Sequence, residues 1–206
     1  AWSVMIRGTQ KWGPGEDNPQ DMLTNLQAVG QSNSDQLRAV KTSMEMAGIK
    51  ADEPVEFVGH SQGGIIAAQL AADPQVRSHY RVASVLTAGS PVAGFHPDSS
   101  VPMLNMENTR DIVPALDGGA NANRGHALTL HFDSEHLERK QGQDNPIAAH
   151  DIATYTEAIR ECESADAGRY RNIEDVHRWE EERRTRLGIT DATRTRSYIF
   201  DTRRVS

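Results

Sequence analysis

Residues 55–72 read VEFVGHSQGGIIAAQLAA and combine three signals in one short segment. The first four residues are β-branched, aromatic or flanked by such residues, and this run predicts a buried strand. Residues 64–72 are small and apolar, which predicts a closely packed helix that ends near Asp73-Pro74. Between them stands Gly59-His60-Ser61-Gln62-Gly63, in which Gly59 and Gly63 allow a turn too tight for a Cβ atom. A strand, a sharp turn carrying a serine, and a helix are typical of a nucleophile elbow.

The pentapeptide itself reads G-x-S-x-G, a pattern that arises by chance in roughly one chain in ten of this composition. The alternative is therefore a glycine-rich turn in which Ser61 is an ordinary polar residue. The flanking strand and helix favour the elbow, because they place the serine where the first N–H groups of a helix face its reaction partner.

The remainder of the chain alternates between strand and helix patterns. Strands are expected at 2–7, 82–88, 102–105 and 126–132, helices at 21–29, 34–48, 151–161 and 172–187, a loop at 11–20, and an edge strand at 197–200. This alternation predicts an α/β fold with a mostly parallel central sheet flanked by helices on both faces.

Composition narrows the class of protein. The chain has 206 residues, 37% of them hydrophobic and 25% charged, which predicts one soluble globular domain. A formal net charge of −7 argues against nucleic acid as a partner. No apolar run is long enough for a transmembrane helix. Cys162 is the only cysteine, so an internal disulfide is excluded, and a bystander role is favoured over a nucleophile.

The chain divides into two stretches of different character. Residues 1–161 carry the strand and helix pattern of a catalytic core, and residues 162–206 form a charge-rich C-terminal extension expected to pack on the same domain. The dense Arg and Glu pattern of this extension predicts a solvated helix face with i,i+4 pairs. A surface for a protein partner at 162–206 is the alternative.

The N-terminal residues begin almost inside a strand, without an initiator Met or the features of a signal peptide. We therefore expect the core to be N-terminally truncated, with upstream sequence cut away. Export as part of a larger bacterial protein is favoured over a cytoplasmic location.

A serine hydroxyl needs a base within hydrogen-bond reach, and the base needs an acidic partner that holds its tautomer. In sheets with this elbow the chain order is Ser, then Asp or Glu, then His, each on a loop after a later strand. Asp111 follows a predicted strand, and His150 stands on a loop just before a predicted helix. Both are expected beyond the carboxyl ends of the strands, where active-site loops gather.

Four stretches carry a resemblance to a known family: Arg7-Gly8-Thr9, residues 59–64, Gly89-Ser90-Pro91 with residues 111–114, and His150 followed by Tyr155. Through them the chain resembles the α/β-hydrolases, and within these the lipases of the fungal triacylglycerol lipase-like type, often called class 3. The resemblance covers about residues 1–160. The charge-rich extension has no counterpart in the family.

The resemblance implies a role for each residue of a catalytic triad. Ser61 would be the nucleophile, Asp111 the acid and His150 the base. The oxyanion hole would be formed by Thr9 and by the backbone N–H of Gln62, where the family usually has Leu. Such donors typically contribute about 3 kcal/mol each to lowering the barrier.

Other residues compete for these roles. His60 neighbours the nucleophile but is expected to point away from it, in a structural role. His126 and His131 are the alternatives to His150 as base, and Asp117 is the alternative to Asp111 as acid. The histidines lack the spacing of a zinc site, so neither a metal nor another cofactor is expected.

Substrate is the least defined property. Trp12, Met22 and Leu23 would form a small lid or one wall of an acyl pocket, although helix-core contacts are the favoured alternative for the last two. The resemblance implies lipid or phospholipid esters and leaves open a transient contact with a membrane surface. An acyltransferase with the same triad, and a module of a larger secreted protein such as a lipid-degrading toxin, are competing hypotheses.

Overall fold

The computed structural model describes residues 1–8, 35–123, 125–137, 146–164 and 170–200. Within these residues the chain forms one five-stranded sheet in the order β1-β2-β3-β4-β5, and each neighbouring pair of strands is parallel. The strands are β1 (Trp2–Ile6), β2 (Pro54–His60), β3 (Arg81–Ala88), β4 (Met103–Asn108) and β5 (Ala127–Phe132). The predicted α/β fold with a parallel central sheet is confirmed.

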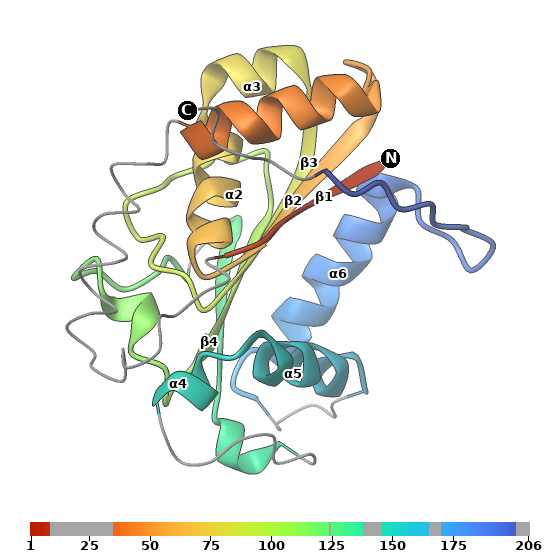
Figure 1. Ribbon diagram of the computed structural model, residues 1–206. Coiled ribbons are helices and arrows are strands. Elements are labelled where there is room, and N and C mark those ends of the chain that lie inside the picture. Colours follow the sequence, from red (N-terminus) through yellow and green to blue (C-terminus); the bar gives the residue numbers. More distant parts are fainter. Residues whose placement is uncertain (9–34, 124, 138–145, 165–169, 201–206) are drawn as a thin grey trace.

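Helices cover both faces of the sheet (Figure 1). One face carries the helical residues 35–47, α2 (Gln62–Ala72) and α3 (Pro74–His79), and the other carries α5 (Ile152–Ser164) and α6 (Ile173–Leu187). The short elements are α4 (Pro146–Ala149) and the 3-10 turns η1 (Val113–Ala115) and η2 (Ser134–His136). Strands covered on both faces explain why β2 and β3 read as nearly continuous apolar runs.

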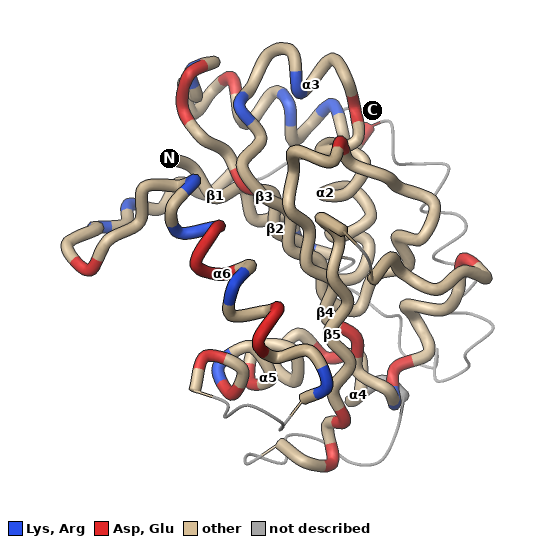
Figure 2. Tube along the Cα trace, turned by 180° about the vertical axis from the view of Figure 1, so that it is seen from behind, with Lys and Arg blue, Asp and Glu red and all other residues tan. Residues whose placement is uncertain are grey.

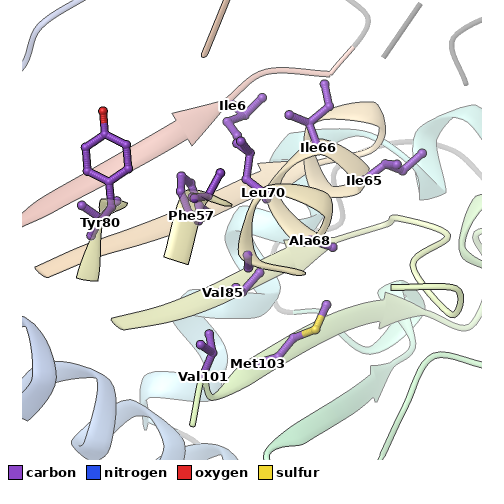
Figure 3. Packing of buried hydrophobic residues seen from close by; sticks show 14 of the residues in the cluster. Ile6, Phe57, Ile65, Ile66, Ala68, Leu70, Tyr80, Val85, Val101 and Met103 are labelled. Carbon is purple, nitrogen blue, oxygen red and sulfur yellow. The ribbon is translucent and has the colours of Figure 1, made fainter. Parts of the chain in front are cut away.

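The core between the sheet and α2 places the nucleophile's strand and helix in direct contact. Phe57 of β2, Ile66 of α2 and Val85 of β3 are all fully buried in this cluster (Figure 3). A second cluster joins β4 and β5 to α5 and α6 and contains Phe132, Tyr155 and other apolar residues. The sheet is thus held rigid from both sides, which is what a precise site at its edge requires.

The charged helix α6 is part of the second layer of this fold. Its apolar face, with Ile173, Val176 and Trp179, is buried, as the sequence pattern predicted. Basic and acidic residues alternate along its length (Figure 2). The charges are not all solvated, because Arg183 reaches the sheet and forms a bidentate pair with the buried Glu56 of β2, at 2.6 and 2.7 Å.

Some predictions of local structure were wrong. Residues 197–200 form no strand and lie in an exposed coil, where the ring of Tyr198 lies 5.8 Å from that of Trp2. The remaining apolar side chains of this segment stay exposed, Ile199 to 85%. The short helices α3 and α4, each beginning at a proline, were not expected from the sequence. The predicted helix at 21–29 and the loop at 11–20 lie outside the described residues.

In the described part of the chain, no helix combines the length and apolarity needed to cross a bilayer.

Candidate active site

Three of the predicted residues meet at one edge of the sheet, beyond the carboxyl ends of its strands. Ser61 follows β2, Asp111 follows β4, and His150 stands between α4 and α5. The carboxyl ends of parallel strands share one edge, so residues far apart in the sequence come together there.

Ser61 adopts a strained backbone conformation, with φ 56° and ψ −127°. Among the described residues it is the only non-glycine residue with positive φ. The turn is held by two backbone hydrogen bonds, from the Ser61 N–H to the Ala88 carbonyl at 2.9 Å and from the Gly64 N–H to the Ser61 carbonyl at 3.0 Å. A strained serine between a strand and a helix is the geometry that raises a side chain above a sheet.

The glycines around Ser61 stand where no side chain fits. A Cβ atom on Gly59 would lie 2.2 Å from the Gly63 backbone, and one on Gly63 would lie 2.1 Å from the Ile6 carbonyl oxygen. Gly64 is a third such position, which sequence reasoning missed. A Cβ atom there would lie 2.0 Å from the Ser90 hydroxyl. These contacts let α2 pack directly on β1 and β2.

The side chains of Ser61, His150 and Asp111 form a continuous hydrogen-bonded chain. Nε2 of His150 lies 2.9 Å from Oγ of Ser61, and Nδ1 of the same ring lies 2.7 Å from Oδ2 of Asp111. All three residues are buried, Ser61 to 3% exposure. Because a carboxylate only accepts hydrogen bonds, Nδ1 carries the ring proton and Nε2 is left as acceptor for the serine hydroxyl.

Asp111 is held by further donors. The Val113 N–H donates to its Oδ1 at 2.9 Å, and the Tyr155 hydroxyl donates to its Oδ2 at 2.7 Å. Burial raises the pKa of Tyr155 above its ordinary value, and the Asp111 charge raises it further, so the phenol stays protonated. Tyr155 belongs to one of the four stretches that carry the family resemblance, but the sequence analysis assigned it no role. Its position on the helix after His150 is the signal that could have assigned one.

Asn108, the last residue of β4, forms hydrogen bonds to other segments of the site. Its side-chain amide donates to the Ala149 carbonyl at 2.9 Å, directly before His150. Its Oδ1 accepts from the backbone N–H groups of Arg110 and Ser134, each at 3.2 Å. Sequence reasoning missed this residue, because neither its burial nor its hydrogen bonds to distant segments can be read from the sequence.

The sequence predicts that His60 points away from Ser61 in a structural role, and in the structure its side chain contacts the backbone and the ring of His150. Its Nε2 lies 2.8 Å from the His150 carbonyl oxygen, and the two rings are 4.7 Å apart between centroids. Burial lowers the pKa of His60 to about 4, and the neighbouring His150 lowers it in the same direction.

The oxyanion-hole prediction lies partly outside the described residues, as do the pocket predictions: Thr9, Trp12, Met22 and Leu23 all fall in the segment 9–34. Gln62 is the first residue of α2, and its side chain donates to Oε1 of Gln36 at 2.6 Å. Its backbone N–H belongs to the helix terminus, where the first N–H groups lack an intrahelical acceptor. Gly8 lies beside it, because a Cβ atom there would be 3.6 Å from the Gln62 nitrogen.

The competing residues lie elsewhere or have other partners. His126 contacts the Pro97 carbonyl through Nε2 at 3.1 Å, and His131 pairs with Glu107 at 3.1 Å. Asp117 accepts from the Ala93 N–H at 2.9 Å. In the described ranges no group of three or more His, Cys, Asp or Glu residues is arranged to hold a metal ion.

No protein-family model matches the chain, and no curated protein matches it either.

Proposed function

We propose that this protein is a serine hydrolase that cleaves carboxylic esters through an acyl-serine intermediate. The observation that carries the proposal is the hydrogen-bonded chain from Ser61 through His150 to Asp111, with distances of 2.9 and 2.7 Å. A strained, buried serine paired with a histidine that is in turn oriented by a carboxylate is the arrangement that activates a hydroxyl nucleophile.

In the proposed mechanism, Ser61 Oγ attacks the ester carbonyl while Nε2 of His150 takes the hydroxyl proton. Asp111 holds the ring tautomer and stabilises the imidazolium that forms. The backbone N–H groups of Gln62 and Thr9 would stabilise the oxyanion. His150 then passes its proton to the departing alcohol, and a water molecule activated by the same histidine releases the acid.

The same arrangement supports the proposal that residues 1–161 form an α/β-hydrolase core similar to the class 3 lipases. The parallel sheet, the elbow after β2 and the chain order Ser, Asp, His all agree with it. The extension at 162–206 is proposed to be part of this domain, because α6 packs on the sheet through a buried apolar face.

An apolar acyl group is the proposed substrate feature. Ile112 follows the acid directly and is 37% exposed, and Ile152 stands two residues after the base and is 54% exposed. The contact between Asp111 and His150 brings their two loops together. The exposed isoleucines, one next to the acid and one at the start of α5 just after the base, therefore offer an apolar surface to an acyl chain.

The test is labelling with a fluorophosphonate probe together with turnover of p-nitrophenyl esters of short and long acyl chains. Wild-type protein should be labelled and active, and Ser61→Ala should lose both. Ser84→Ala, which changes a buried serine within β3, is the matched control and should keep both. A folded wild-type sample that is neither labelled nor active would contradict the proposal.

A further inference from the structure

The side chain of His60 lies against the proposed base, His150. Its Nε2 is 2.8 Å from the backbone oxygen of His150, and the two imidazole planes are tilted by 33° at a centroid distance of 4.7 Å. The ring of Tyr155 lies 5.4 Å from that of His60. The base is thus in contact with the residue that directly precedes the nucleophile.

The chemistry of this contact defines which atom carries the proton. A backbone carbonyl only accepts hydrogen bonds, so Nε2 of His60 is the donor and its Nδ1 is not protonated in the neutral ring. Since burial holds its pKa at about 4, His60 stays neutral at pH 7. It therefore keeps its hydrogen bond to His150 while the base takes up and releases a proton.

We propose that His60 is a positioning residue for the base, holding the main chain and the ring of His150 from the strand that carries the nucleophile. The inference rests on the proposed function and adds to it a residue outside the triad.

His60 supports the base from the same strand that leads to the nucleophile. Ser61 follows the last residue of β2 directly, so a bond from His60 to the loop of His150 couples nucleophile and base to one rigid strand. Asp111 supports the ring at Nδ1, and His60 supports the backbone and the ring face. A displacement of about 1 Å between reacting groups can cost on the order of 100-fold in rate.

Two substitutions separate the parts of this role. His60→Phe keeps an aromatic ring against His150 but removes the donor, whereas His60→Gln keeps a donor and removes the ring. The matched control is His177→Phe, because His177 also bonds a backbone carbonyl through Nε2 at 2.8 Å, that of Cys162 in α5. The control breaks the same kind of bond outside the active-site loops.

The first readout is catalytic. His60→Phe should lower kcat and the fluorophosphonate labelling rate by about tenfold, the size of one hydrogen bond, with KM unchanged. His60→Gln should recover part of the loss, and His177→Phe should label at the wild-type rate even where its Tm falls. Equal labelling rates for His60→Phe and wild type, or equal losses in His60→Phe and His177→Phe, would overturn the inference.

The second readout needs no activity. The proton between Nδ1 of His150 and Asp111 should give a downfield proton NMR signal, and this signal should broaden or vanish in His60→Phe but persist in His177→Phe. Loss of this signal in His60→Phe alone, in a protein that the probe never labels, would refute the proposed function while supporting the positioning. An unchanged signal would refute the positioning itself. Should His60→Phe fail to fold, His60→Asn, whose shorter side chain cannot reach the carbonyl, replaces it with the same expectations.

Discussion

The hydroxyl of Tyr155 lies 2.7 Å from Oδ2 of Asp111, the same carboxylate oxygen that Nδ1 of His150 approaches at 2.7 Å. The hydroxyl also accepts the Asn108 N–H at 3.2 Å, at the end of β4. One phenol therefore connects the strand, the acid and, through the acid, the base. Its contribution can be measured because removing one oxygen atom leaves the ring packing in place.

Tyr155→Phe should lower kcat/KM by about 10- to 100-fold, the range for one hydrogen bond to a charged group. It should also lower the free energy of unfolding by about 1–3 kcal/mol, because the buried Asn108 N–H loses its acceptor. Ester turnover and denaturant unfolding measure the two effects. Tyr170→Phe, which removes a hydroxyl 3.3 Å from the Glu161 carboxylate, is the control and should leave turnover unchanged. Wild-type kinetics in Tyr155→Phe would mean that Asp111 needs no such support.

Ile152→Ser should reduce turnover of long-chain esters more than turnover of short-chain esters. The reason is that the exposed isoleucine beside the base would lose its apolar contact with the acyl chain, at about 0.8 kcal/mol for each methylene no longer buried. Kinetics across a series of p-nitrophenyl esters give the chain-length profile. Ile199→Ser is the control, because Ile199 is 85% exposed and lies on the C-terminal coil. A profile unchanged by Ile152→Ser would remove this isoleucine from the proposed substrate surface.

Arg183→Met should destabilise the fold by about 3–5 kcal/mol, because it leaves the buried Glu56 carboxylate without its bidentate partner. Glu56 stands on β2, so the substitution removes a contact between α6 and the strand that carries the elbow. Thermal or denaturant unfolding measures it. Arg178→Met removes an exposed partner of Asp175 on the same helix and should cost less than about 1 kcal/mol. Similar values for both variants would show that α6 does not anchor to the sheet through this pair.

The lowered pKa of His60 predicts that the folded protein loses stability in acid. Its pKa is about 4 in the folded chain and about 6.5 when unfolded, so between these values the unfolded state binds more protons. The stability from the neutral ring is therefore fully present above pH 6.5 and is lost as the pH falls towards 4, by about 3 kcal/mol in total.

Measuring the free energy of unfolding of wild type and of His60→Gln from pH 7 to pH 4 isolates the contribution of His60. The wild-type curve should fall more steeply across that window, since both proteins share every other titrating group. Parallel curves would mean that His60 is protonated as easily in the folded chain as in the unfolded one.

Local patterns were enough to predict most of the fold. The apolar run at 55–58 and the glycine-flanked Ser61 predicted a strand, a turn and a helix, because these signals depend on residues close in the sequence. The same holds for α6, whose apolar face recurs at a helical period. The edge strand expected at 197–200 failed for the opposite reason. A strand exists only if a partner pairs with it, and that depends on distant parts of the chain.

By itself, the amino-acid sequence determined the alternation of strands and helices, the elbow around Ser61 and the chain order of the candidate triad. These follow from backbone sterics, side-chain periodicity and the short-range chemistry of turns. Only the tertiary structure decided that His60 lies behind His150 and that Tyr155 shares the Asp111 carboxylate with it. Such contacts join residues 44 and 90 positions apart, and their geometry depends on how the loops pack at one edge of the sheet.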